Sequence, residues 1–256
     1  MNFIIDFVKF VLQRVTYIPK TAVLPIPKEE CCKITTHYLF GTVNQHATKA
    51  LIDAKWHTFY SKHGWTETGY YNITKCFKPT DFCTDCNGLL DWYLGIDVNA
   101  NHTYNHFCTD QEEISKSTRP YVIGEAVFRK SGSRMCHVGW IVGFDSDGEP
   151  LVAEARGLKE GVGVWRLCDR LPSGNKTGFT HRALMKKIFE YDIDPNPNWI
   201  KFEVTKPYHK GDEYKAMQKA LNMANYKDER GKKLKEDGKW GPKSQFAFDT
   251  MLKNHS

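Results

Sequence analysis

A single segment organises the chain: Thr84-Asp85-Cys86-Asn87-Gly88-Leu89-Leu90-Asp91-Trp92-Tyr93-Leu94-Gly95. Its apolar residues recur at helical spacing, so one face of a helix is expected to be buried, and Gly95 is suited to end that helix. Asp85 is a favourable N-cap, which puts Cys86 in the first turn. Backbone N–H groups and the helix dipole at that position stabilise a thiolate, the nucleophilic form of cysteine. A lone cysteine at a helix start is more often a small apolar packing residue, so this interpretation needs partners elsewhere.

Two later segments supply such partners. Residues 135–143 alternate and are rich in β-branched and aromatic side chains, which predicts a strand with His137 near its start. Residues 150–157 predict a second strand after a hairpin signal. If the strands pair, His137 and Glu154 lie side by side on one face. A thiol nucleophile needs a base, and the base needs a group that holds its ring, so Cys86, His137 and Glu154 are the predicted catalytic residues.

Four motifs support this interpretation, over roughly residues 32–170: Tyr38-Leu39-Phe40-Gly41, Asp85-Cys86-Asn87-Gly88-Leu89, Gly124-Glu125-Ala126-Val127-Phe128, and His137-Val138-Gly139 followed by Glu154-Ala155-Arg156-Gly157. In this order they resemble the NlpC-type cysteine peptidases of bacterial cell walls. The resemblance implies an α+β, papain-like catalytic domain, in which a helix carrying the cysteine packs on an antiparallel sheet. It also implies substrate-binding roles for Tyr38 and Asp85, and it requires no metal or organic cofactor. Glu154 stands where that family usually has His, and Asn87 where it usually has Ser.

The same resemblance implies bacterial peptidoglycan as the substrate and partner. The implied reaction is acyl transfer at an amide bond of the peptide stem. An endopeptidase that cuts after D-γ-glutamate and an amidase that cuts between muramic acid and L-alanine use the same residues, so both activities stay open. The CHAP-type hydrolases share the Cys–His–Glu arrangement, but the motifs around Cys86 and at Arg156-Gly157 fit the NlpC type better.

The C-terminal residues carry a second resemblance. Tyr214, Met217, Gln218 and Leu221 have helical spacing, and the segment 237–242, Asp-Gly-Lys-Trp-Gly-Pro, leads through a turn to a proline at the start of another helix. This pattern resembles the small helical peptidoglycan-binding repeat at the ends of many cell-wall hydrolases. We expect an all-α unit with Trp240 in its core, because so small a unit needs its aromatic residues inside. A wall-binding role for Trp240 is the weaker alternative.

Composition and pattern predict the remaining organisation. The expected parts are an N-terminal amphipathic helix with a proline-containing lead-in (residues 1–30), the peptidase domain (31–194), a linker (195–209) and the peptidoglycan-binding domain (210–256). Inside the peptidase domain, residues 122–128, 136–144, 151–155 and 163–167 predict strands. Residues 96–121 predict a long polar loop, residues 183–191 a short helix, and residues 199–204 a further strand.

Charge and hydropathy bear on partners and location. Of the net charge of +6, five charges belong to residues 206–256, which carry 12 Lys and Arg against 7 Asp and Glu. Such a segment favours polyanions, including an anionic cell wall. No apolar run is long enough to span a membrane, so no stable membrane insertion is expected. The first 20 residues lack the features of a signal peptide, which predicts synthesis in the cytoplasm and action on the wall after a separate release, as for phage lysins. That route would keep the eight cysteines reduced before release.

Two hypotheses compete with a hydrolase. The chain could be a non-catalytic cell-wall-binding protein with a degenerate peptidase domain, for which Glu154 at the position of the family's usual third residue is the hint. It could also be a zinc-dependent nucleic-acid binder that uses Cys83, Cys86, His102 and Cys108 with the basic C-terminal segment. We rank zinc lower, because no second Cys-x-x-Cys motif follows and the predicted strand of His137 is then unexplained; the preferred interpretation has no nucleic-acid partner. A redox pair of Cys83 and Cys86 has the reverse of the usual nucleophile-first order.

Overall fold

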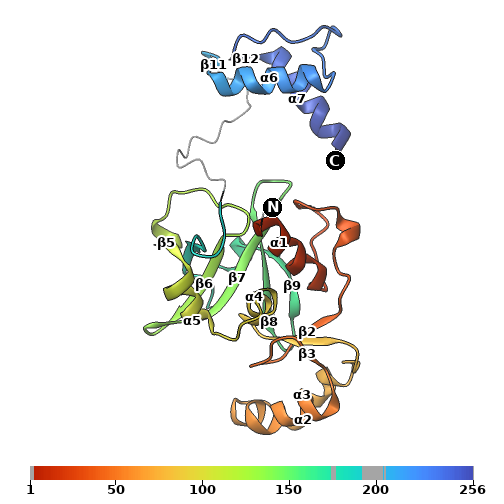
Figure 1. The fold of residues 1–256 in the computed structure, drawn as a ribbon, viewed down its shortest axis with the longest axis vertical. Coiled ribbons are helices and arrows are strands. Elements are labelled where there is room, and N and C mark those ends of the chain that lie inside the picture. Colours follow the sequence, from red (N-terminus) through yellow and green to blue (C-terminus); the bar gives the residue numbers. More distant parts are fainter. Residues whose placement is uncertain (1–2, 174–176, 192–203, 205, 256) are drawn as a thin grey trace. The chain divides into compact units, whose positions relative to one another are not determined.

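The chain is described by a computed structural model at residues 3–173, 177–191, 204 and 206–255 (Figure 1). It divides into two compact units, Met1–Ile193 and Asp194–Ser256. The predicted linker at 195–209 and the strand predicted at 199–204 fall largely outside the described residues. Among the described residues, no helix has the length and apolar character needed to cross a membrane.

The first unit is built around an antiparallel sheet. Its strands follow the order β5 (Thr109–Glu113), β10 (His181–Leu184), β6 (Ala126–Ser131), β7 (Arg134–Asp145), β8 (Pro150–Gly157) and β9 (Gly161–Arg166), and β1 (Ala22–Val23) pairs with β7. The four strands predicted between residues 122 and 167 are confirmed as β6 to β9, with shifted ends. The unit is α+β, as the sequence predicts.

Helices cover one face of this sheet, and the alternation of side chains along β7 separates the two faces. Val138, Trp140 and Val142 point into the larger core, which also holds Leu89 of α4 (Gly88–Leu94) and the apolar face of α1 (Phe3–Arg14). Ile141 points to the other face, where a smaller core includes Val152 and Phe179. The prediction that the N-terminal helix packs on this domain is confirmed, because its apolar face is buried in this core.

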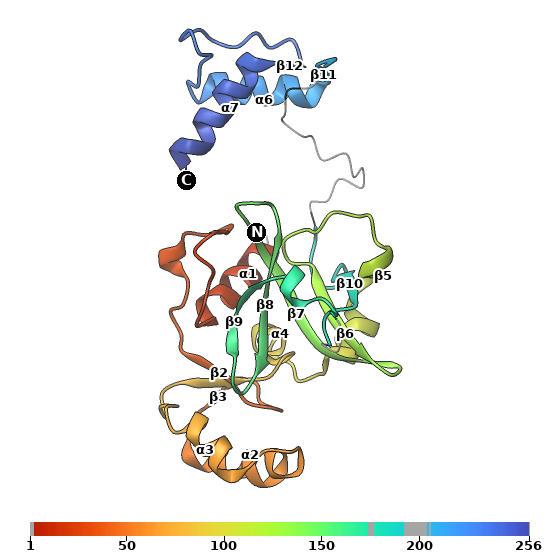
Figure 2. The same ribbon diagram turned by 180° about the vertical axis from the view of Figure 1, so that it is seen from behind.

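A small sheet and two helices form a second layer at one end of the main sheet (Figures 1 and 2). In the small sheet, β2 (Thr36–Tyr38) runs parallel to β4 (Phe82–Thr84), and β3 (Gln45–His46) pairs antiparallel with β4. Between β3 and β4 the chain forms α2 (Lys49–Thr58), the short 3-10 helix η2 (Tyr60–Lys62) and α3 (Glu67–Thr74). Their aromatic side chains, among them Trp56 and Tyr70, build a core of their own.

Two predictions about local structure are wrong. Residues 96–121 are not a loop, because they form α5 (Ala100–His102), the π-helical turn η3 (Thr103–Phe107), β5 and the 3-10 helix η4 (Ile114–Lys116). Residues 183–191 do not form a helix, because residues 181–184 are strand β10, which lies between β5 and β6. Each of these strands is stabilised by a partner distant in sequence, which local patterns do not reveal.

The second unit contains the two predicted helices, α6 (Asp212–Met223) and α7 (Pro242–His255), with Pro242 at the start of α7. It is not purely α-helical, because β11 (His209–Lys210) and β12 (Lys239–Trp240) form a short antiparallel pair. Trp240 is fully buried and packs with Tyr214 and Leu221. An exposed sugar platform at Trp240 is therefore ruled out, and its role is that of a core residue.

We expect truncation in α1 to destabilise the first unit. The ring of Phe7 is fully buried and meets that of Trp140 edge to face, with 5.5 Å between centroids. Phe7→Ala removes this packing and should lower the free energy of unfolding by about 3–5 kcal/mol. Exposed Asp6 on the same helix is the control, and Asp6→Ala should cost less than about 1 kcal/mol. Denaturant unfolding followed by tryptophan fluorescence measures both, and equal midpoints for the two variants would contradict the assignment of α1 to the core.

Candidate active site

The small sheet brings two of the predicted residues to the cysteine segment. Tyr38 is the register partner of Thr84 across the parallel pair β2–β4, so its ring lies near the residues that follow β4. Burial raises the pKa of Tyr38 above its usual range, and the charges of Cys86 and Asp85 raise it further. The Tyr38 hydroxyl is therefore a neutral hydrogen-bonding group near the thiol.

Asp85 shapes the turn that carries Cys86. Its carboxylate accepts the backbone N–H groups of Asn87 at 3.0 Å and Gly88 at 2.9 Å through Oδ1, and that of Gly41 at 3.1 Å through Oδ2. The predicted N-cap position is wrong, because α4 begins at Gly88 with Asn87 as its N-cap, so Cys86 precedes the helix and is not in its first turn. The Asp85 carboxylate nevertheless accepts N–H groups at the helix start, as a capping side chain does. Gly88 allows a close approach, since a Cβ there would lie 2.6 Å from the Thr42 carbonyl oxygen.

Asn87, which stands where the resembling family usually has Ser, points inward. Its side-chain Nδ2 donates to Asp91 Oδ1 at 2.9 Å, and its Oδ1 accepts the Thr103 hydroxyl at 2.9 Å. Asn87 is 2% exposed, so it joins α4 to the π-helical turn instead of facing a substrate.

The Cys86 sulfur is half-buried and lies beside the start of β7, where the backbone N–H groups of Val138 and Asn87 point to it. Burial and the Asp85 charge nevertheless raise the pKa of Cys86 to about 12, against the lowering effect of these N–H groups and of Arg129. The expectation that the helix start stabilises a resting thiolate is therefore wrong. The thiol is protonated at rest, and a base must remove its proton during attack.

His137 and Glu154, the predicted base and its orienting group, are in contact. His137 Nε2 and Glu154 Oε2 are 2.5 Å apart, and both side chains are almost fully buried. The paired strands β7 and β8 put them on one face, as the sequence predicts. An Nε2–H that donates to Glu154 leaves Nδ1 unprotonated and able to accept a proton. Within the described part of the chain no hydrogen bond joins the thiol to the ring, so Nδ1 would approach the sulfur during reaction.

Arg170 and Phe179 complete this arrangement and were missed by the sequence analysis. Arg170 binds the Glu154 carboxylate through two nitrogens, with Nη2 at 3.0 Å from Oε2 and Nε on Oε1. Phe179 stacks on the His137 ring, with 5.6 Å between centroids, and the Arg170 guanidinium lies over its ring. Gly139 makes room for this ring, since a Cβ there would lie 3.1 Å from Phe179 Cζ. No motif or spacing marks either residue, because Arg170 ends a single 3-10 turn after β9 and Phe179 lies in irregular chain.

Arg129 is a further residue that local patterns did not reveal. It is the register partner of His137 across β6 and β7, and its Nε–H points to Cys136 Sγ at 3.4 Å. Its positive charge lowers the pKa of both Cys86 and Tyr38, so it faces the same site. Arg129 is thus the cation that favours the charged form of the thiol.

The residues of the zinc alternative do not form a metal site. No group of three or more His, Cys, Asp or Glu residues in the described ranges is arranged to hold a metal ion. Cys83 is fully buried in the core of the small layer, and burial raises its pKa to about 12. Its buried sulfur also disfavours a redox pair with Cys86, and both thiols are free.

Comparisons of the chain with protein-family models, with curated proteins and with solved structures find no match. The assignment of function therefore depends on the chemistry of the site itself.

Stability should fall in acid because of Glu154. Burial opposes its ionisation, but hydrogen bonds from His137 and Arg170 outweigh burial and hold the pKa of Glu154 at about 2, below its ordinary 4.5. The Glu154 carboxylate therefore takes up a proton more readily in the unfolded chain than in the folded one. The stabilisation is complete above about pH 4.5 and is lost as the pH falls towards about 2. Denaturant unfolding over this interval should show the loss in the wild type. Glu154→Gln should flatten that part of the profile, and an unchanged slope would contradict the assignment.

Removal of the Arg129 charge should slow alkylation of Cys86. Arg129→Gln leaves the thiolate less stabilised, so reaction with iodoacetamide at a fixed alkaline pH should slow by up to about tenfold. Peptide mass spectrometry separates Cys86 from the other cysteines. Arg134, an exposed arginine on β7, supplies the control, and Arg134→Gln should react like the wild type. Alkylation of Arg129→Gln at or above the wild-type rate would be inconsistent with this placement.

Proposed function

We propose that this chain is a peptidoglycan hydrolase of the NlpC type, with a papain-like catalytic domain and a C-terminal wall-binding unit. The observation that carries the proposal is the buried His137–Glu154 contact of 2.5 Å, with the Cys86 sulfur beside the neighbouring Val138 N–H. A nucleophile, a base with one free ring nitrogen and a carboxylate that holds the ring are the parts that thiol hydrolysis of an amide needs.

The proposed reaction proceeds by acyl transfer. The Cys86 thiol gives its proton to His137 Nδ1 as the sulfur attacks the carbonyl carbon of an amide in the peptide stem. The carbon–nitrogen bond then breaks, and His137 returns the proton to the leaving amine. Water hydrolyses the thioester and restores the thiol. The backbone N–H of Cys86 is the proposed donor to the oxyanion, and no metal or organic cofactor takes part.

Because the pKa of Cys86 is raised, the proposed reaction requires His137 to remove the thiol proton during attack. In a preformed thiolate–imidazolium pair that proton has already moved. Because the thiol is protonated at rest, attack depends on how well the ring is oriented towards it. Glu154 binds Nε2 of His137. Arg170 binds the Glu154 carboxylate, and Phe179 stacks on the imidazole ring. Arg170 and Phe179 are therefore proposed as positioning residues.

Substrate and location follow from the resemblance. Tyr38 is proposed to hold the substrate with its neutral hydroxyl. Three backbone N–H groups already donate to the Asp85 carboxylate, so a substrate contact by Asp85 would have to use the remaining lone pairs of its two oxygens. The scissile bond is either that of the D-γ-glutamyl endopeptidase or that of the amidase. Attachment to a wall-binding unit would raise the effective concentration of the catalytic domain on an insoluble polymer. Action on the bacterial wall after release from the cytoplasm is part of the same proposal.

A non-catalytic wall-binding protein is the second candidate. The pKa of about 12 for Cys86 favours it, because a thiol that stays protonated does not attack. The His137–Glu154 pair favours the hydrolase, because it supplies the base and the orienting carboxylate that amide hydrolysis by a thiol needs.

Wall lysis tests the proposal. The wild type should reduce the turbidity of purified Gram-positive cell walls, and Cys86→Ala should lower the rate at least about a thousandfold while it still sediments with the walls. Cys76→Ala is the matched control, because this cysteine is exposed and follows α3, outside the candidate site. Mass spectrometry of the fragments then distinguishes the amidase from the endopeptidase. Binding without lysis by both wild type and Cys86→Ala would overturn the hydrolase and favour the second candidate.

A further inference from the structure

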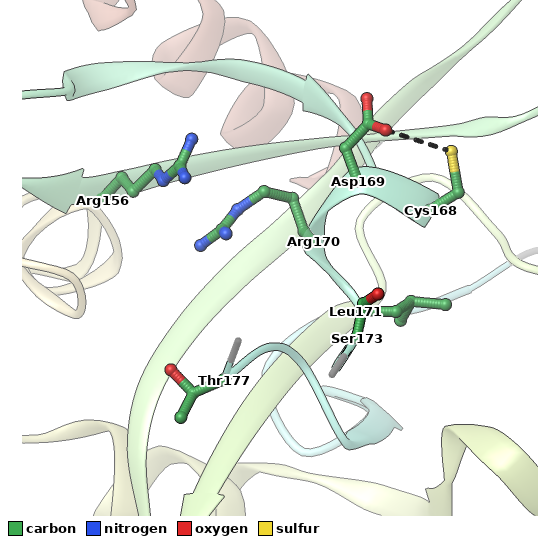
Figure 3. A pocket seen from close by; sticks show the side chains of 7 residues that line it. All are labelled: Arg156, Cys168, Asp169, Arg170, Leu171, Ser173 and Thr177. Carbon is green, nitrogen blue, oxygen red and sulfur yellow. Dashed lines mark hydrogen bonds between the residues drawn. The ribbon is translucent and has the colours of Figure 1, made fainter. Parts of the chain in front are cut away.

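A pocket with a volume of about 670 Å³ opens beside the Glu154–Arg170 pair (Figure 3). Arg156, Arg170 and Thr177 are among the residues that line it. Arg156 is two residues from Glu154 on β8, so both lie on the sheet face that carries His137. The pocket therefore lies on the sheet face of His137, and Arg170, which binds Glu154, connects the two. Its volume suits a small organic molecule.

Two guanidinium groups of this pocket keep donors that the protein does not use. Arg170 donates Nε and Nη2 to Glu154, and its Nη1 has no hydrogen-bond partner in the described part of the chain. Arg156 lies over the Trp165 ring at 5.5 Å and makes no ion pair with any described carboxylate. In Figure 3 the side chains of Arg156 and Arg170 extend towards one another, and Thr177 lies to one side of the two guanidinium groups.

The acidic groups nearby do not neutralise Arg156. Glu154 is already paired with Arg170 and His137. Asp169 also lines the pocket, but its Oδ1 is the acceptor for Cys168 Sγ at 4.0 Å, and Figure 3 shows its carboxylate directed away from both guanidinium groups. Arg156 therefore contributes a positive charge that a ligand can complement, and arginine binds carboxylate and phosphate groups in planar, charge-assisted contacts.

We propose that this pocket binds an oxyanion, a carboxylate or a phosphate group of a small molecule, through Arg156 and Nη1 of Arg170, with the Thr177 hydroxyl as a further donor. The anion has two conceivable sources: a carboxylate on the leaving half of the substrate, or a free anion. The first source rests on the proposed function, in which His137 protonates the leaving amine, and the pocket lies on the same sheet face as His137. Binding of an oxyanion as such is independent of hydrolysis.

Calorimetric titration of the full chain tests this site, with succinate and inorganic phosphate as separate probes at constant ionic strength. All measurements use the Cys86→Ala background, so the result does not depend on whether the chain is a hydrolase. Saturable binding of either probe is expected. Saturation by succinate favours a carboxylate ligand and saturation by phosphate alone favours a free anion, and both outcomes support the site.

Variants locate the binding. Arg156→Gln should weaken binding about tenfold or more, because a charge-assisted contact is lost. Arg134→Gln, which removes an exposed arginine elsewhere on the sheet, should bind like the parent. Thr177→Val changes an exposed side chain and should weaken binding several-fold without loss of folding, which keeps the test decisive if Arg156→Gln is unstable. No saturable binding of either probe, or parental affinity in both pocket variants, would overturn the proposal.

Discussion

The ionised carboxylate of Glu154 constrains the whole catalytic face of the sheet. A buried carboxylate is costly unless charged or polar donors satisfy it, and here His137 and Arg170 do so. The two partners come from different parts of the chain: His137 from β7 and Arg170 from the 3-10 helix η5 (Cys168–Arg170) after β9. The charge is therefore satisfied only when β7, β8 and η5 are all in place. Phe179 binds a fourth segment to them, because it stacks on both the imidazole and the guanidinium.

Cys86, the proposed nucleophile, comes from a different part of the fold than His137, and its environment differs for that reason. Cys86 follows the small sheet and precedes α4, whose Leu89 packs into the larger core, on the face of the main sheet opposite to His137. The sulfur meets β7 at the backbone N–H of Val138. Burial and the Asp85 charge keep the thiol protonated. The site thus combines an ionised carboxylate with a neutral thiol, and in the proposed reaction the imidazole is the group that moves the proton.

Local patterns predicted the elements whose spacing of apolar and turn residues is visible within a short stretch of sequence. Amphipathic spacing predicted α1, and turn chemistry with Pro242 predicted α7. The alternation of β7 and β8 predicted that His137 and Glu154 share a face, because side-chain direction along a strand has a period of two. The patterns failed at β5 and β10, since β5 pairs with β10 and β10 pairs with both β5 and β6. A sequence window that holds one of them contains neither partner.

The sequence by itself determined which residue types are present at each step of the proposed chemistry: a cysteine before a buried helix, and a histidine and a glutamate on adjacent strands. Only the tertiary structure decided their electrostatic state. It assigned Arg170 to Glu154 across sixteen residues of chain and Arg129 to the thiol site across β6 and β7. It also buried Cys86 enough to reverse the expected shift of its pKa. The physical reason is that ionisation depends on solvent and on charges a few ångströms away, and both are set by packing between distant segments.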